Sequence, residues 1–305
     1  MLTQEHLQDA VDYGRCFIKL GSPASYIPEL ARVNKYQLGA CIVNLDGTVM
    51  ECGDTRTRFT IQSISKLASL ILAISDKGSD YLFHDKVGVE PTGDPFNSIV
   101  KLETKTKPFN PFINAGAITV ADCIEGNSSE EKFERFLSFV RKLCGDEEIS
   151  LNEAVYLSEK ATGDRNRALA YYLKASGILE GNVEECLDFY FKCSVNVTAV
   201  DIAQMSAVLA NHGACPVTQE ELIPKESAKA VRALMLTCGM YDGSGEFAMT
   251  VGFPAKSGVG GGIAAALVDR MGIGVFGPSL DEKGNSVGGI KILEHLSKNL
   301  DFNLF

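Results

Sequence analysis

The alternation of apolar and polar positions divides the chain into two strand-rich ends and a helical middle. A first helix is predicted over about residues 4–19, followed by the segment QLGACIVNLDGTVMECG, whose strand-like runs flank Asp46 and Gly47. An Asp-Gly pair between two such runs is a strong hairpin signal. We therefore predict two antiparallel strands within about residues 37–60.

From Ser63 to about residue 245 the pattern is almost wholly helical, because apolar residues recur at spacings of three and four between polar, Gly- and Pro-rich loops. Strand signals return only in FAMTVGFPAKSGVGGGIAAALVDRMGIGVFGPSL. A last helix follows, which Asn285 or Ser286 can cap.

These elements predict an α+β fold. A two-stranded hairpin alone is marginal in water, so the N-terminal and C-terminal strands are expected to share one antiparallel sheet flanked by helices. The large helical lobe is then inserted between the strands of that sheet. With no internal repeat or proline-rich linker, we expect a single domain, 1–305, with a sheet lobe (about 1–62 and 246–305), a helical lobe (about 63–245) and a cleft between them.

Charge narrows the choice of partners. The 305 residues include 29 basic and 39 acidic ones, and the net charge of -10 repels phosphate backbones and anionic lipid surfaces. Nucleic acid and membranes are therefore not expected partners. Glu5, Asp9 and Asp12 stand where a signal peptide needs a basic start, and apolar runs such as LASLILAI are far shorter than the roughly 20 residues of a membrane span. We expect a soluble, cytoplasmic protein.

Cysteine and histidine usage gives no sign of a disulfide framework or a metal centre. The nine cysteines are scattered through apolar segments without paired spacing, so we expect them to be reduced and buried. Of the four histidines, only His212 lies close in sequence to a cysteine, Cys215, and that pair has no partner pair. No metal and no cofactor are predicted.

Candidate chemistry begins in FTIQSISKLASLILAISDKG, residues 59–78, where Ser63 precedes Lys66 by three positions at the start of an apolar helical pattern. Positions three apart lie on one face of a helix, which brings the hydroxyl and the amine together. A neutral lysine can take the serine proton, and both burial and the positive end of a helix lower a lysine's pKa. The pair is therefore a candidate nucleophile and base.

Ser-x-x-Lys is a common pattern, and the chain contains it three times, at 63–66, 98–101 and 129–132. Ser129 opens an acidic helix start, where we expect a helix cap rather than a nucleophile. Ser98 lies in a proline-flanked segment without clear helical context. Only the match at Ser63 has a suitable structural setting, and it requires corroboration.

Corroboration comes from FPAKSGVGGGIAAALV, where Lys256, Ser257 and Gly258 lie on or beside a strand and precede a run of glycines. Serine acyltransferases with a Ser-x-x-Lys helix carry a similar Lys-Thr/Ser-Gly strand facing it. The run lacks the Gly-x-Gly-x-x-Gly register of a dinucleotide loop before a long helix. A glycine-softened strand packed against a helix remains an alternative explanation.

Longer stretches carry a resemblance to a known family. The sequence resembles the serine-dependent glutaminases, amidohydrolases that convert L-glutamine to L-glutamate and ammonia, over nearly its whole length. The stretches that carry the resemblance are SYIPELA (25–31), QSISKL (62–67), KPFNPFINAGAI (107–118), SEKATGDRNRALAYYL (158–173), LDFYFKCSV (187–195), TCGMYDGSGEFA (237–248) and PAKSGVGGGI (254–263).

The resemblance implies a fold like that of the serine β-lactamases and penicillin-binding proteins, and a homodimer or homotetramer. It implies that Ser63 is the nucleophile, that Lys66 activates it and that Tyr241 relays the proton. It also places the backbone N–H groups of Ser63 and Val259 in an oxyanion hole. The further positions that it assigns to substrate binding are Tyr26, Gln62, Asn114, Glu159, Asn166 and Tyr190.

The chemistry of a free amino acid agrees with this set, because its ammonium needs a fixed anion and its carboxylate needs neutral or backbone donors. Glu159 is the plausible anion. Two other functions on the same fold stay open: a penicillin-recognising hydrolase, for which Ser194-Val195-Asn196 nominally supplies a Ser-x-Asn element, and a non-catalytic amino-acid sensor. Activation by anions and selectivity for glutamine over asparagine are also left open by the sequence.

Overall fold

One five-stranded sheet joins the two ends of the chain. The structure is a computed structural model that describes residues 2–98 and 107–305. Its main sheet has the order β2-β1-β8-β7-β6, and every neighbouring pair is antiparallel. The strands are β1 (Gly39–Asn44), β2 (Val49–Gly53), β6 (Ala255–Ser257), β7 (Gly262–Leu267) and β8 (Met271–Phe276). The predicted sharing of one sheet by N- and C-terminal strands, and with it the α+β fold, is confirmed.

The hairpin predicted at Asp46 and Gly47 connects β1 to β2. The Asp46 carboxylate accepts a hydrogen bond from the Thr48 backbone N–H at 2.9 Å, and Gly47 has a φ of 85°, a conformation that glycine adopts without strain. The other edge of β1 pairs with β8, so that Gly39 lies opposite Phe276. Residues more than 200 positions apart in the sequence are thereby fixed side by side.

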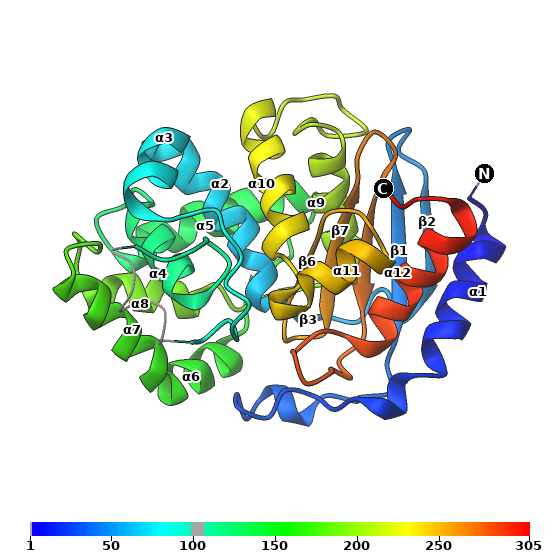
Figure 1. Cartoon of the computed structure of the whole chain (residues 1–305), viewed down its shortest axis with the longest axis horizontal. Helices are drawn as coiled ribbons and strands as arrows, with labels where there is room; N and C mark the ends of the chain where they lie inside the picture. Colours follow the sequence, from blue (N-terminus) through cyan, green and yellow to red (C-terminus); the bar gives the residue numbers. More distant parts are fainter. Residues whose placement is uncertain (1, 99–106) are drawn as a thin grey trace.

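Helices cover both faces of this sheet. The terminal helices α1 (Gln4–Arg15) and α12 (Val287–Leu300) pack together on one face, and α9 (Ala199–Ala210) packs on the other (Figure 1). Alternate side chains of β1 divide accordingly, since Ile42 belongs to the core beneath α1 and α12 whereas Val43 belongs to the core on the α9 side. The strands other than the edge strand β2, which is partly exposed, are therefore buried on both sides.

A lobe of helices lies beside the sheet, around a core that includes Phe136, Phe189 and Leu169 (Figure 1). Short helical turns, among them α3 (Ser79–Tyr81), join the longer helices. The longer helices are α2 (Ser65–Lys77), α4 (Asn114–Cys123), α5 (Ser129–Cys144), α6 (Glu153–Thr162), α7 (Asp164–Ala175), α8 (Val183–Lys192), α10 (Lys225–Cys238) and α11 (Ser244–Thr250).

The middle of the chain also holds a second, small sheet that the sequence pattern did not predict. Its strands are β3 (Phe59–Thr60), β5 (Val195–Val197) and β4 (Ser150–Leu151), in the order β3-β5-β4. β3 falls at the end of the range predicted as strand, whereas β4 and β5 lie in the segment predicted as helical, because strands of two or three residues are too short to show an alternating pattern. This sheet fixes the chain immediately before Ser63, because the Ile61 N–H donates to the Val195 carbonyl at 2.9 Å.

Helix ends are capped largely as expected, with one correction. Ser286 caps α12 through a hydrogen bond from the Gly289 N–H. At α5, however, the cap is Ser128 and not Ser129, because the extended Ser128 accepts a bond from the Glu131 N–H. Ser129 is the first helical residue, and its hydroxyl donates to Asp188 at 2.8 Å.

All nine cysteines are free thiols. Seven are buried, whereas Cys16 is exposed and Cys215 is partly exposed, so the prediction that all are buried was wrong for these two. Among the helices of the described ranges, none combines the length and hydrophobicity that a membrane crossing requires.

Candidate active site

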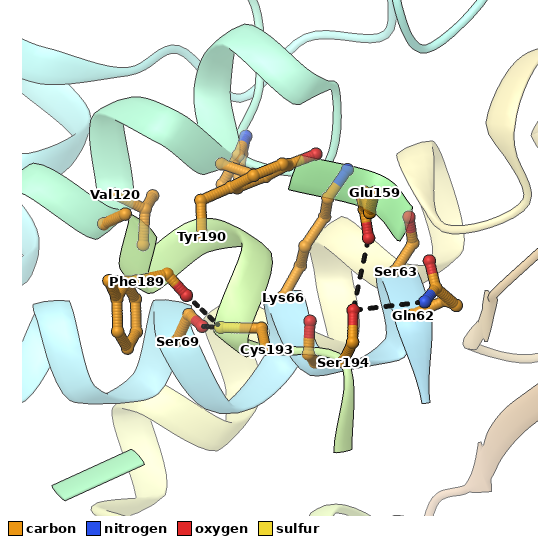
Figure 2. Close-up of a pocket in the computed structure, with 14 residues that line it drawn as sticks. Gln62, Ser63, Lys66, Ser69, Val120, Glu159, Phe189, Tyr190, Cys193 and Ser194 are labelled. Carbon is orange, nitrogen blue, oxygen red and sulfur yellow. Dashed lines mark hydrogen bonds between the residues drawn. The ribbon is translucent and has the colours of Figure 1, made fainter. Parts of the chain in front are cut away.

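The candidate nucleophile lies at the junction of the small sheet and α2. Ser63 occupies a 3-10 turn, Gln62–Ile64, rather than the first α-helical turn that the sequence predicts. Gln62 has a φ of 48°, in the left-handed region that non-glycine residues rarely adopt, and such strain is concentrated at functional sites. Ser63 lines a pocket together with Lys66, Glu159 and Tyr190 (Figure 2).

Lys66 points into this pocket from the first turn of α2. Its side chain is buried, and its Nζ donates to the Phe112 carbonyl and to Asn114 Oδ1, both at 2.9 Å. Burial lowers the pKa of Lys66 to about 7, while the Glu159 carboxylate acts in the opposite direction. No hydrogen bond joins the amine to Ser63 in the described structure. The amine thus shares the pocket with Ser63, is held there by two other acceptors, and is readily deprotonated.

Tyr241 approaches the same point from the loop before α11. Its φ of 55° is a second left-handed conformation at the site. The ring packs against Phe96 with centroids 4.9 Å apart, and Lys256 Nζ lies 4.5 Å from its centroid. Burial raises the pKa of the phenol, and the Ser63 side chain and the Val259 N–H lower it, so the hydroxyl faces both groups. Among the described residues, none forms a hydrogen bond of full geometry with this hydroxyl.

Val259 follows β6 and places its backbone beside the nucleophile. The glycine run makes this possible, because a Cβ on Gly260 would lie 2.2 Å from the Thr60 carbonyl oxygen. The run therefore packs against the chain that leads into Ser63 rather than against a helix. Neither the Ser63 nor the Val259 N–H donates to a backbone carbonyl in the turns and loops of the described ranges. Two N–H donors without a backbone acceptor in these turns and loops thus lie near Ser63 and the Tyr241 hydroxyl.

Glu159, on α6, supplies a carboxylate to the pocket. Part of the side chain is open to the cleft, but the carboxylate is enclosed, and this burial raises its pKa to about 7. Ser194 Oγ donates to Glu159 Oε2 at 3.2 Å, and Gln62 Nε2 donates to Ser194 Oγ at 3.4 Å (Figure 2). Hydrogen bonding by Ser194 and the nearby Lys66 both oppose the pKa increase.

Three helix-borne residues and a loop tyrosine complete the set that the family resemblance assigns to substrate binding. Asn114 Nδ2 donates to Asn166 Oδ1 at 3.0 Å, which joins the start of α4 to α7. Tyr190, on α8, lines the pocket, and burial followed by the Glu159 charge raises the pKa of its phenol. The Tyr26 side chain is 53% exposed, yet burial, Tyr241 and Glu159 raise its pKa, so its hydroxyl end points into the cleft.

The predicted residues fall on two adjoining hollows. Gln62, Ser63, Lys66, Glu159 and Tyr190 line the pocket of Figure 2. A second hollow of about 450 Å³ is lined by residues that include Tyr26, Phe96 and Val259. Tyr241 lies between these hollows, because it faces Ser63 of the first and both Tyr26 and Val259 of the second. Asn114 is linked to the pocket through its hydrogen bond from the Lys66 amine, and Asn166 is linked only indirectly, through Asn114, in the described structure.

Two side chains outside the predicted site complete it. Ser194 is enclosed, with 2% of its surface exposed, and no local sequence signal indicated its contact with Glu159. Lys256 is completely buried, and its Nζ donates to the carbonyls of Gly239 and Ser257 at 3.1 and 2.5 Å. Lys256 therefore ties β6 to the segment that carries Tyr241.

Of the competing motifs, those at Ser129 and Ser194 can be compared with the structure, and neither forms a separate site within the described ranges. Lys132 Nζ donates to the Ala121 carbonyl at 2.9 Å while Ser129 bonds to Asp188, so these two side chains have separate partners. Lys101, of the match at Ser98, lies outside the described residues. In the nominal Ser-x-Asn element, Asn196 Oδ1 accepts from Asn152 at 2.9 Å and is not among the residues that line the pocket.

Nothing in the described ranges resembles a metal centre. No three His, Cys, Asp or Glu side chains gather there in a way that could hold a metal ion. His212, which is near Cys215 in the sequence, has its Nε2 atom 2.6 Å from Asp269 Oδ1.

Comparison with known proteins gives one consistent result. A model of the glutaminase family matches residues 21–305. Glutaminase 2 of Clostridium perfringens is 55% identical over 302 residues, which cover 98% of this chain and 99% of that protein. The crystal structure of a probable glutaminase of Bacillus subtilis is 45% identical, with a TM-score of 0.92 over 98% of this chain and 96% of that chain.

A further solved structure is a Bacillus subtilis glutaminase in covalent complex with 5-oxo-L-norleucine, formed by reaction with 6-diazo-5-oxo-L-norleucine. It is 44% identical to this chain, with a TM-score of 0.89, and the match covers 98% of each chain. These structures have the α+β fold described above.

Proposed function

The chain belongs to the glutaminase family, a family of hydrolases that act on glutamine, and we propose that it hydrolyses L-glutamine to L-glutamate and ammonia through an acyl-enzyme on Ser63. The observation that carries this mechanism is the buried Lys66 amine beside Ser63, whose pKa is lowered to about 7. About half of such an amine is neutral at pH 7, whereas an ordinary lysine is almost entirely charged.

In the acylation step, the Ser63 oxygen attacks the side-chain amide carbon of glutamine. Lys66 takes the serine proton and returns it through the Tyr241 hydroxyl to the departing nitrogen, so that the C–N bond breaks, ammonia leaves and a γ-glutamyl ester remains on Ser63. Tyr241 suits this relay because its hydroxyl faces the Ser63 side chain. Water then attacks the ester by the same proton route and releases L-glutamate.

Charge that develops on the amide oxygen needs donors that are already in place. The N–H groups of Ser63 and Val259 are free of backbone acceptors in the described turns and loops, and we assign them to the oxyanion hole. Removal of one such donor from other enzymes costs about 3 to 4 kcal/mol of transition-state stabilisation. The close packing at Gly260 keeps these two N–H groups together.

The remaining residues are assigned to the amino-acid end of the substrate. Glu159 accepts the α-ammonium group, and Asn114, Asn166 and the hydroxyls of Tyr26 and Tyr190 act as donors toward the carboxylate. Gln62 contributes through its contact with Ser194. From the family resemblance we further propose a cytoplasmic homodimer or homotetramer, organised as one domain of two lobes.

Ammonia release from L-glutamine, L-asparagine and a β-lactam control tests the proposal, with wild type and Ser63→Ala side by side. We expect release from glutamine that Ser63→Ala reduces by many powers of ten, because the nucleophile of an acyl-enzyme is removed. Near-wild-type turnover in the variant would refute the role of Ser63. Tight glutamine binding without ammonia release would favour the sensor, and rapid β-lactam hydrolysis would favour the penicillin-recognising alternative.

A further inference from the structure

Ser194 lies where three parts of the site meet. It immediately precedes β5, the central strand of the small sheet, and its backbone carbonyl accepts a hydrogen bond from the Asn152 N–H at 2.9 Å. Asn152 in turn is the N-cap of α6, the helix that carries Glu159. The next residue, Val195, accepts from Ile61, just before the nucleophile. The backbone at Ser194 is therefore fixed relative to both ends of the cleft.

The Ser194 hydroxyl completes a chain of hydrogen bonds across the pocket. It accepts from Gln62 Nε2 at 3.4 Å and donates to Glu159 Oε2 at 3.2 Å (Figure 2). The Gln62 amide nitrogen can only donate to this hydroxyl and an ionised carboxylate can only accept from it, so the serine proton is directed at Glu159. Glu159 Oε2 is the oxygen that this proton fixes.

We propose that Ser194 is a positioning residue that orients the Glu159 carboxylate toward the α-ammonium group of the substrate. This inference rests on the proposed function, in which Glu159 is the anion that binds that group. A glutamate on a helix has several rotamers, and an enclosed carboxylate without its donor can rotate away from the ligand. Ser194 acts through Glu159 and does not touch the reacting amide.

The proposal predicts a loss of binding that depends on the ammonium group. L-Glutamate, the product, carries that group, and glutarate is the same diacid without it. In Ser194→Ala, the inhibition constant of L-glutamate should rise at least about tenfold, in line with the loss of a hydrogen bond to a charged group. The inhibition constant of glutarate should change less than about threefold. KM for glutamine should rise while kcat stays within about threefold of wild type.

The pH dependence of L-glutamate binding gives a second readout. Hydrogen bonding by Ser194 lowers the pKa of Glu159, so its removal should shift the acid limb of binding to higher pH. The titratable groups that face Glu159 are Lys66, Tyr26, Tyr190 and Cys193. All four stay in place in the variant, so a shift reports on the missing hydroxyl.

Two variants and a control keep the test decisive. Ser194→Cys keeps nearly the same volume with a much weaker donor, so it tests the same loss if Ser194→Ala does not fold. Ser206→Ala is the matched control, because Ser206 is also buried and its hydroxyl donates to the Ile202 carbonyl of its own helix rather than to a carboxylate. Thermal melting establishes that each protein is folded.

The proposal is supported if the Ser194 variants bind L-glutamate more weakly while their binding of glutarate is little changed, and if Ser206→Ala shows no such difference. The proposal is overturned if, in a folded Ser194 variant, the ratio of the two inhibition constants is the same as in the wild type, whether or not both ligands bind more weakly. Failure of the proposed function has a different signature: the wild type releases no ammonia from glutamine, or Ser63→Ala still does.

Discussion

Replacement of Lys66 by methionine should abolish activity and at the same time remove a destabilising element of the fold. Lys66 is 5% exposed, and its pKa of about 7 shows that the folded protein disfavours its ammonium form. Methionine has a similar length and no charge. The same burial that prepares the amine for catalysis therefore destabilises the folded state at neutral pH.

The size of the effect follows from the pKa change. A shift from 10.5 to about 7 corresponds to about 5 kcal/mol, at about 1.4 kcal/mol per pKa unit. Loss of the hydrogen bonds to Phe112 and Asn114 offsets part of this gain, by roughly 1 to 3 kcal/mol for each acceptor left unpaired, but that offset does not vary with pH. The pH dependence of the stability difference is therefore the cleaner quantity.

The sign is fixed by proton binding. Between pH 7 and 10.5 the unfolded chain holds a proton on Lys66 that the folded protein has lost, so wild-type stability rises with pH in this window. Lys66→Met lacks this gain. Its stability relative to wild type should fall by about 2 kcal/mol between pH 7 and pH 8.5. Loss of the Lys66 charge also raises the pKa of Glu159, which acts in the same direction.

Urea unfolding of both proteins at pH 6, 7 and 8.5 measures this difference, and ammonia release from glutamine measures activity. Lys77→Met, on the exposed side of the same helix, is the matched control for loss of a lysine charge. A stability difference that stays constant from pH 7 to 8.5 would refute the reasoning, because it would mean that folded Lys66 keeps its proton throughout this range. The neutral amine would then no longer explain the activation of Ser63.

Three further predictions follow from the same geometry. In the wild type, kcat/KM should fall at least tenfold per pH unit below about pH 6, because Lys66 must be neutral and Glu159 ionised, and both have a pKa of about 7; a profile flat to pH 5 would contradict this. Tyr241→Phe should lower kcat by roughly 10²- to 10⁴-fold with little change in Tm, because the ring contacts remain; unchanged kcat would remove Tyr241 from the proton route. Gly272→Ala should destabilise the protein by several kcal/mol in urea unfolding, since its Cβ would lie 2.1 Å from an α9 backbone nitrogen, whereas Gly245→Ala, with open space, should cost nothing.

The sequence predicts the main sheet because its signals are local. Asp46 and Gly47 mark the hairpin, and the strand-rich ends have no other partner with which to bury their apolar faces. The small sheet escaped prediction because pairing of Thr60 with Asn196 depends on residues 136 positions apart, and strands this short carry no pattern of their own.

The site residues also differ in how far local sequence patterns could predict them. Ser63 and Lys66 could be proposed from helical spacing alone, and Lys256 from its motif. From the local pattern alone, Glu159 is an ordinary charged residue on the solvent side of a helix and Tyr190 is a half-buried aromatic residue. Only the family resemblance indicated a role in substrate binding for them. Ser194 was considered solely as part of a Ser-x-Asn element, because no local pattern shows that a serine after a helix end will meet a carboxylate 35 positions earlier.

The charges of the cleft connect substrate binding to the activation of Ser63. In the empty site an ionised Glu159 raises the pKa of Lys66 and so favours the ammonium, which cannot act as a base. In the proposed complex, the α-ammonium of glutamine neutralises that carboxylate and removes its influence on Lys66. The balance then moves toward the neutral amine when a free amino acid occupies the site. On this argument, recognition of the ammonium and deprotonation of Ser63 are coupled through one carboxylate, and the hydroxyl of Ser194 keeps that carboxylate in place for both.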